Sequence, residues 1–262
     1  RQFGHRFVQE RVFSRFSCWA LGGKRSIVSQ CDNCCNLLDR FAAPPDNSPM
    51  RFIWAAVMAM WTGAAVAEPV VVFAAASLKE PIDALAAEMG DVVVSYGGSG
   101  TLARQVMQGA PADVVLLANA DWLEDLAGAV HGAADFASNE LVLIGGVDAP
   151  DLLLADLPVA LGADRLAIGA VNAVPAGIYG KAGLEALGIW DSVKDHLAEV
   201  DNVRAALVLV ARGEVPYGVT YATDVAASDA VRIVARFPDT SHPVIRYVGG
   251  LVSDRPEAAA FW

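Results

Sequence analysis

Two stretches decide the fold of this chain: Val70-Val-Val-Phe-Ala-Ala-Ala-Ser77-Leu-Lys-Glu80 and, 22 residues later, Val92-Val-Val-Ser-Tyr-Gly-Gly-Ser99-Gly-Thr-Leu-Ala-Arg104. Each reads as a short apolar strand, then small residues and a serine, then a helical pattern. Ser77 and Ser99 are therefore expected where a strand passes into the N-terminus of a helix. Such an end carries unpaired backbone N–H groups and the positive end of the helix dipole. Two of them facing one cleft predict an anion site that needs no charged side chain.

Apolar runs and helical patterns alternate along the rest of the chain from residue 68. We expect strands at 70–73, 92–95, 113–117, 139–144, 166–169, 217–221, 231–235 and 244–248, and helices at 78–89, 101–108, 122–129, 179–187 and 203–211. Short apolar strands separated by helices indicate mainly parallel sheets that are covered on both faces.

The order of these elements predicts two lobes. The strand at 139–144 is expected to cross into a second lobe, and the last two strands to return to the first. The first lobe would then comprise residues 68–142 plus 225–262, and the second residues 143–224. A short helical pattern begins at Pro256, and we expect the last helix of the first lobe to be truncated, which puts the packing of that lobe in question.

The formal charge of −11 is unevenly distributed along the chain. Residues 1–67 carry eight Lys/Arg and four Asp/Glu, whereas residues 68–262 carry eleven Lys/Arg and twenty-six Asp/Glu. So acidic a body is a poor partner for nucleic acid or for an anionic membrane surface. An anionic ligand would have to be held by local dipoles against an unfavourable overall field.

All four cysteines, Cys18, Cys31, Cys34 and Cys35, precede residue 68. The rest of the chain has no thiol, so neither disulfides nor thiolate metal sites are expected there. The last three cysteines resemble half of a zinc site, but no second pair follows at a suitable spacing.

Residues 50–67 have the features of a secretory signal peptide. Met50-Arg51 precedes a mainly apolar run that closes with Ala65-Val66-Ala67, so cleavage is expected after Ala67. A membrane anchor is the alternative, although the run is short for a bilayer span. No cysteine follows the cleavage site, which argues against a lipid-anchored form. Residues 1–49 show no clear period, and we expect them to be non-native, unstructured upstream sequence.

Six short motifs follow one another between residues 70 and 255. They are Val72-Phe-Ala-Ala-Ala-Ser-Leu78, Ser99-Gly-Thr-Leu-Ala-Arg-Gln105, Gly109-Ala-Pro-Ala-Asp113, Val174-Pro-Ala-Gly-Ile-Tyr179, Asn202-Val-Arg-Ala-Ala-Leu207 and Gly218-Val-Thr-Tyr-Ala-Thr-Asp224. In this order they resemble the molybdate-binding proteins of ABC importers, which are periplasmic binding proteins of the type II fold. The resemblance implies a two-lobed α/β fold, in which each lobe is a mainly parallel sheet flanked by helices and the ligand cleft lies between the lobes.

In that family, hydroxyls and backbone amides hold the oxyanion. The resemblance implies that molybdate is bound by Ser77, Ser99 and Tyr221 through their hydroxyls, and by the amides of both serines, Ala176 and Val203. These residues would hold the oxygens of molybdate and not a bare metal cation, and no cofactor is implied. The alternatives are an ordinary helix N-cap at Ser77 and a core tyrosine at position 221.

The resemblance also implies a function. The chain is expected to be a monomeric periplasmic protein that captures molybdate, or tungstate, and delivers it to an ABC permease. Molybdate has only acceptor oxygens, which neutral hydroxyl and amide donors can match. Selection against the smaller sulfate would follow from donors held too far apart to reach its oxygens. A binding protein for another tetrahedral oxyanion, such as sulfate, is the alternative within this class.

An enzyme is the alternative from another class, and here it would be a secreted serine hydrolase. Gly97-Gly-Ser-Gly-Thr101 superficially resembles a nucleophile elbow, but threonine stands where that motif closes with glycine. His131, His196 and His242 lie in separate polar segments, which gives no sign of a partner base or a metal site. Asp113, after a Pro-Ala turn, is expected to be a structural hydrogen-bond acceptor and not a catalytic acid.

Overall fold

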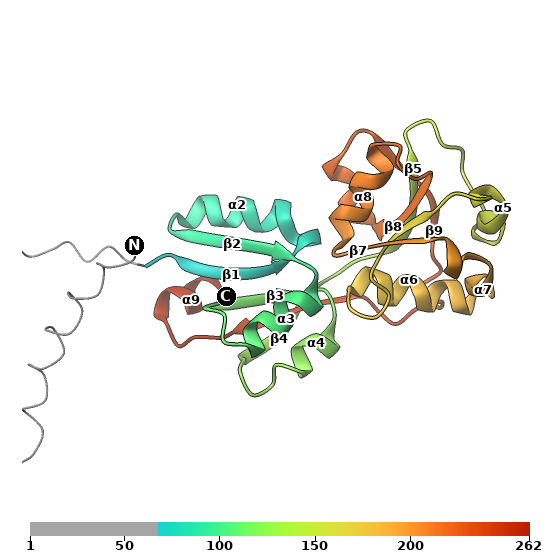
Figure 1. Cartoon of the computed structure of the whole chain (residues 1–262). Coiled ribbons are helices and arrows are strands. Elements are labelled where there is room, and N and C mark those ends of the chain that lie inside the picture. The colour runs from blue at the N-terminus through green and yellow to red at the C-terminus, as the bar shows by residue number, and fades with distance from the viewer. Residues whose placement is uncertain (1–67) are drawn as a thin grey trace, which may run out of the picture. The chain divides into compact units, whose positions relative to one another are not determined.

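The structure, a computed structural model, describes residues 68–262 of the chain. The expectations for residues 1–49 and for a signal peptide at 50–67 lie outside the described residues. Residues 68–262 form two five-stranded sheets, each with helices packed against both faces (Figure 1). Each sheet with its helices is called a lobe below. No helix in this range is both long and apolar enough to span a bilayer.

The first sheet has the strand order β2-β1-β3-β10-β4. Its strands are β1 (Val70–Ala75), β2 (Val92–Gly97), β3 (Val114–Leu117), β4 (His131–Ser138) and β10 (Arg246–Leu251). Strand β1 pairs in parallel with β2 and β3, whereas β10 runs antiparallel to β3 and β4, so the sheet is mixed. One face packs against α2 (Lys79–Met89) and α9 (Pro256–Phe261), and the other against α3 (Ser99–Met107) and α4 (Ala120–Glu124).

The second sheet has the order β7-β6-β8-β5-β9 and is also mixed. Its strands are β5 (Leu141–Gly146), β6 (Leu166–Gly169), β7 (Leu197–Val200), β8 (Tyr217–Tyr221) and β9 (Val231–Arg236). One face packs against α8 (Val203–Ala211), and the other against α5 (Leu157–Leu161), α6 (Pro175–Ala186) and α7 (Trp190–Val193). Short 3₁₀ turns complete the described elements: η2 (Ala76–Leu78), η3 (Leu154–Asp156), η4 (Lys194–His196) and η5 (Ala222–Ala227).

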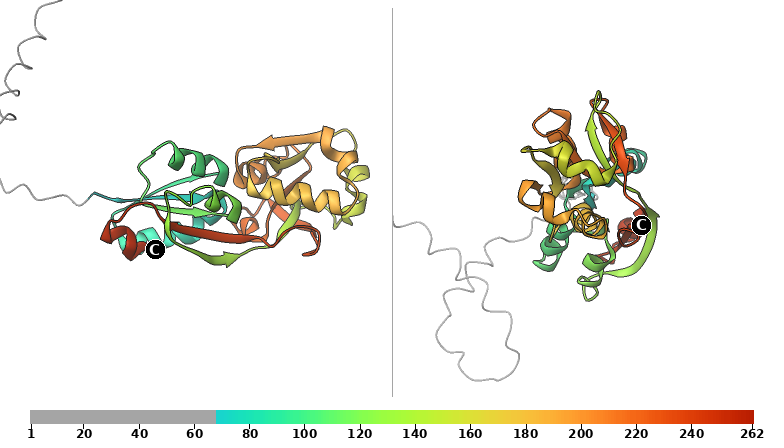
Figure 2. Two further views of the ribbon diagram at one scale, coloured as in Figure 1. Left: turned by 90° about the horizontal axis from the view of Figure 1, so that it is seen from below. Right: turned by 90° about the vertical axis from the view of Figure 1, so that its right-hand side faces the viewer.

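The chain passes between the two sheets twice, after β4 and between β9 and β10 (Figure 2). The strand expected at 139–144 does enter the second sheet, as β5. The prediction that the strand at 231–235 returns to the first lobe is wrong, because β9 pairs antiparallel with β5 from Val142–Arg236 to Gly146–Val231. A short apolar pattern indicates that a strand is buried but does not specify which sheet buries it. Sheet membership therefore places residues 141–142 and 231–236 in the second lobe.

Strand β4 has no counterpart among the predicted elements. All eight of its residues are exposed, so its sequence lacks the apolar alternation that marks a half-buried strand. It is held by backbone pairing with β10 at the edge of the first sheet. The strand expected at 244–248 does return to this sheet, as β10.

Asp113 accepts hydrogen bonds that connect elements of the first lobe, as expected for a structural acceptor after the Pro-Ala turn. Its Oδ2 accepts from the backbone N–H of Val71 at 2.9 Å, and its Oδ1 from the hydroxyl of Ser253 at 2.6 Å. The guanidinium of Arg255 lies 2.9 Å from Oδ2. One carboxylate thus joins β1, the start of β3 and the segment before α9, so its role as a structural acceptor is confirmed.

Candidate functional site

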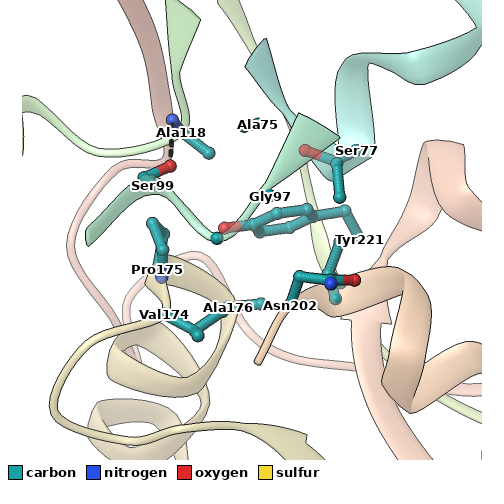
Figure 3. Close-up of a pocket in the computed structure, with 13 residues that line it drawn as sticks. Ala75, Ser77, Gly97, Ser99, Ala118, Val174, Pro175, Ala176, Asn202 and Tyr221 are labelled. Carbon is teal, nitrogen blue, oxygen red and sulfur yellow. Dashed lines mark hydrogen bonds between the residues drawn. The ribbon is translucent and has the colours of Figure 1, made fainter. Parts of the chain in front are cut away.

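A small pocket lies between the two lobes, at the ends of strands from both sheets (Figure 3). Its lining consists of Ala75, Ala76, Ser77, Gly97, Gly98, Ser99, Ala118, Val174, Pro175, Ala176, Asn202, Val203 and Tyr221. The space between these atoms is about 200 Å³, including its open side. So small a space has room only for a ligand of a few atoms.

The structure brings all five residues implied by the resemblance to this pocket. Ser77 lies in η2 at the entry to α2, and Ser99 is the first residue of α3. Ala176 is the second residue of α6, Val203 is the first of α8, and Tyr221 ends β8. Four helical starts, two from each lobe, therefore meet around one small space.

These helical starts leave backbone donors at the pocket. No side chain caps η2, α3 or α6. At α8, the side chain of Asn202 accepts from the amide of Ala205 at 3.0 Å, which leaves the amide of Val203 outside that cap. Because the first N–H groups of a helix have no acceptor within the helix, these amides can donate to a ligand. The dipoles of the helices favour an anion at the same point.

The hydroxyl of Ser99 is oriented by the backbone beside it. Its Oγ accepts a hydrogen bond of 3.0 Å from the amide of Ala118, just after β3. The serine is buried, with 1% of its surface exposed. A hydroxyl that accepts on one side still carries its own proton, so Ser99 can donate that proton to a ligand in the pocket.

The hydroxyl of Ser77 is oriented in the same way by a side chain. Its Oγ accepts from the hydroxyl of Tyr247, on β10, at 2.9 Å. Ser77 is not the helix N-cap of the alternative interpretation, since Ala75 holds that position before η2. Both seryl oxygens therefore accept a hydrogen bond within the protein, and both hydroxyls can donate to a ligand in the pocket.

Tyr221 brings to the pocket a buried polar atom that no residue in the described part of the chain satisfies. Its side chain is 1% exposed, and its hydroxyl has no hydrogen-bond partner among the described residues. In Figure 3 the ring extends between Gly97 and Ala176, with its hydroxyl toward the space that the serines border. Burial raises the pKa of Tyr221 well above that of an ordinary phenol, so the hydroxyl keeps its proton and remains a donor.

Of the lysines and arginines in residues 68–262, none lines the pocket. Arg204 directly follows Val203, but its guanidinium pairs with Asp224 at 2.7 Å and, across the cleft, with both carboxylate oxygens of Glu80. Burial raises the pKa of Asp224 to about 6, while Arg204 acts in the opposite direction. Within residues 68–262 no three His, Cys, Asp or Glu side chains cluster as cation ligands would. The hydroxyl and amide donors at the pocket therefore suit an oxyanion.

Two glycines at the start of α3 let the lobes approach closely. A Cβ atom on Gly98 would lie 2.4 Å from the carbonyl oxygen of Asp201, and one on Gly100 would lie 2.5 Å from that of Ala173. Both carbonyls belong to the second lobe. These glycines thus make room for the backbone of the opposite lobe and not only for a ligand.

Two residues that orient the seryl hydroxyls, Ala118 and Tyr247, are not predicted from the sequence. Ala118 directly follows the apolar strand β3, close to where Ala75 and Gly97 end β1 and β2, and this parallel could have pointed to it. Tyr247 is 170 residues from Ser77. Nothing in the local pattern of β10 indicates that contact, so only the folded chain shows it.

Comparison with known proteins places this geometry in context. A family model for bacterial extracellular solute-binding proteins matches residues 70–262. The chain is 37% identical to the molybdate-binding protein ModA of Escherichia coli over 206 residues, which cover 72% of this chain and 79% of that protein. It is 36% identical to the molybdate-binding protein ModA of Haemophilus influenzae over 208 residues, 74% of this chain and 82% of that protein.

Solved structures share the same fold. The periplasmic molybdate-binding protein of Azotobacter vinelandii matches with a TM-score of 0.64 at 22% identity, covering 73% of this chain and 89% of that chain. The sulfate-binding protein SubI of Mycobacterium tuberculosis matches with a TM-score of 0.58 at 17% identity, covering 74% and 79% respectively. The two-lobed α/β fold expected from the sequence is thereby confirmed, but its sheets are mixed and not mainly parallel, since two of the four strand pairs in each are antiparallel.

Proposed function

Since this chain belongs to the family of bacterial extracellular solute-binding proteins that includes the molybdate-binding protein ModA, we propose that it binds molybdate outside the cytoplasm. It is a binding protein and not an enzyme. The bound oxyanion would be delivered to the membrane permease of an ABC importer, from the periplasm. Cleavage of a signal peptide after Ala67 and a monomeric state are part of the same proposal.

The partnerless hydroxyl of Tyr221 is the observation that carries the proposal. A buried polar group without a partner destabilises a protein by about 1–3 kcal/mol. A ligand that accepts a hydrogen bond at this point would satisfy it. The two seryl hydroxyls donate into the same space, and four helical starts surround it. These hydroxyls and helix-start amides are donors, which fits a ligand with only acceptor oxygens.

The absence of a cation from the lining is consistent with binding a dianion. Hydrogen bonds to a charged group contribute roughly 1.5–3 kcal/mol each, so several neutral donors suffice to hold a doubly charged oxyanion. A lysine or arginine in the pocket would first have to lose its own hydration. Helix dipoles instead spread the compensating charge over the surrounding backbone.

Limited closure of the two lobes would favour molybdate and tungstate over sulfate. The donors come from two lobes whose approach is limited by the contacts at Gly98 and Gly100. A closed form with fixed donor positions cannot contract around a smaller tetrahedral ion, so sulfate would make longer and weaker hydrogen bonds. Sulfate binding is the second candidate, because a sulfate-binding protein shares the fold.

Calorimetric titration of the purified protein with molybdate, tungstate and sulfate tests this function. We expect molybdate and tungstate to bind with similar affinity and sulfate to bind at least about 100-fold more weakly, a difference of about 2.7 kcal/mol. Molybdate at 100 times its Kd should raise the free energy of unfolding by about 2.7 kcal/mol, and Tm with it. Sulfate binding as tight as molybdate binding would overturn the selectivity, and no binding of either ion would overturn the function.

The geometry gives no support to a serine hydrolase. The oxygens of Ser77 and Ser99 accept from a tyrosyl hydroxyl and a backbone amide, and neither donor can act as the general base of a nucleophilic serine. Incubation with p-nitrophenyl esters should therefore give no turnover above that of a Ser99→Ala variant.

A further inference from the structure

A row of hydrogen bonds leads from the connection between the lobes to the pocket. It begins at Asn139, which lies in the passage from β4 to β5. The side-chain Oδ1 of Asn139 accepts from the backbone N–H of Glu140 at 2.9 Å. A backbone N–H can only donate, so this contact fixes which end of the amide is the oxygen. The Nδ2 group must then point the other way, as a donor.

The direction of the next two hydrogen bonds follows from that orientation. Asn139 Nδ2 donates to the hydroxyl of Tyr247 at 3.0 Å, and also to Oγ1 of Thr223 at 2.7 Å. Because the phenol oxygen accepts from the amide, its own proton is available for Ser77 Oγ, 2.9 Å away. Tyr247 is 2% exposed, and water does not compete at this position.

This direction determines what Ser77 can do. With one lone pair occupied by the proton of Tyr247, Ser77 retains its own proton for the pocket. We propose that Tyr247, itself held by Asn139, is a positioning residue that keeps the hydroxyl of Ser77 as a donor toward the bound oxyanion. The inference rests on the proposed function. Without the phenol, the seryl proton can rotate away and leave lone pairs facing an anion, which repel it.

Replacement of the phenol tests the proposal directly. Tyr247→Phe removes one oxygen and keeps the buried ring, and we expect its Kd for molybdate to rise about tenfold. Tyr217→Phe is the matched control, since Tyr217 is also buried but lies at the other end of β8 from Tyr221. Its Kd should stay within about twofold of that of the wild type. A Tyr247→Phe protein that folds and binds like the wild type would overturn the proposal.

A double-mutant cycle separates positioning from a general loss of structure. In a Ser77→Ala background, adding Tyr247→Phe should change Kd by less than about twofold, because the hydroxyl to be positioned is already gone. A structural role independent of Ser77 would instead multiply the two losses. Multiplied losses would therefore contradict the proposal.

Asn139→Asp provides a second variant of nearly the same size. A carboxylate cannot donate, so the proton of Tyr247 would turn toward residue 139 and Ser77 would donate to the phenol. We expect weaker molybdate binding than in Tyr247→Phe, and a loss that shrinks when Ser77 is alanine. An affinity loss of the same size with and without the Ser77→Ala change would show that the added charge causes it. That result would contradict the proposal that Asn139 acts on Ser77 through Tyr247.

The proposal and the proposed function can fail separately. A wild-type protein that binds no molybdate contradicts the proposed function. The coupling between Tyr247 and Ser77 is then measured by thermal unfolding of the free protein. Non-additive shifts in Tm for Tyr247→Phe and Ser77→Ala would support this coupling, and additive shifts would overturn it.

Discussion

The two halves of the pocket differ in how complete they are without a ligand. In the first lobe, each seryl oxygen accepts a hydrogen bond from its own lobe, Ser99 from Ala118 and Ser77 from Tyr247. In the second lobe, the hydroxyl of Tyr221 has no partner, and the other donors are helix-start amides. The first half is thus preorganised, whereas the second half gains its missing partner only from the ligand. We infer that the oxyanion docks first on the serines and that closure of the second lobe completes its binding.

The largest effect is expected where closure itself is blocked. Gly98→Ala places a methyl group 2.4 Å from the carbonyl of Asp201, while the φ of −71° and ψ of 137° at Gly98 suit alanine. The first lobe should fold normally but remain apart from the second, and Kd for molybdate should rise about 100-fold or more. Calorimetry measures the affinity, and small-angle scattering with ligand measures the closure.

Gly128→Ala is the control for this variant, since a Cβ there would meet no atom within 4 Å. Its affinity should match that of the wild type. Unchanged binding by Gly98→Ala would show that closure in solution leaves more room than the structure does.

The second largest effect is expected at the unsatisfied half of the site. Tyr221→Phe removes the partnerless hydroxyl, so the free protein should be as stable as the wild type or more stable by about 1 kcal/mol. Affinity for molybdate should nevertheless fall about tenfold or more, because the ligand loses a donor. A gain in stability by thermal unfolding together with a loss of affinity by calorimetry would confirm that the second lobe, unlike the first, has a donor that only the ligand satisfies. A variant that loses stability but keeps its affinity would assign Tyr221 to the core alone.

A backbone donor of the second lobe can be removed by proline. Val203 is the first residue of α8 and follows Asn202 in an extended conformation, which is a position where proline fits. Val203→Pro should weaken molybdate binding about fivefold to tenfold through the lost amide. Ala120→Pro is the control, since it follows the extended Asn119 at the start of α4 and lies outside the pocket. Equal affinities for the two variants would argue against an amide contact at position 203.

The smallest effect is expected from the ion pair that joins the lobes. Glu80→Gln weakens the contact with Arg204, but Glu80 is about half exposed, so the pair contributes no more than about 1 kcal/mol. Kd should rise roughly two- to fivefold, and the difference from the wild type should vanish at high salt. Asp135→Asn is the control, because its pair with Arg246 stays within the first sheet. Identical salt dependence in both variants would contradict a role in closure.

The sequence predicts the first half of the site better than the second. A strand followed by a serine and a helix marks Ser77 and Ser99 directly, because side chain and position both carry the signal. Ala176 and Val203 would act through amides that every residue has, so only the family resemblance indicates them. Tyr247 and Asn139 act through contacts distant in sequence, which no local pattern encodes.

The fold shows the same limit. Apolar runs predict most strands, but the partner of β9 depends on how the whole second sheet assembles, and the prediction for it was wrong. Strand β4 was missed because every residue in it faces solvent. Periodicity reports burial, and neither sheet membership nor a fully exposed edge can be derived from it.

The chain crosses between its two lobes twice, and this restricts their relative motion. Two bodies joined by one segment can rotate independently, whereas the two crossings here, at residues 139–140 and 237–245, allow a narrower range of relative rotation. The permease in the proposed function would then have only that range of rotation by which to distinguish the ligand-bound protein from the free one.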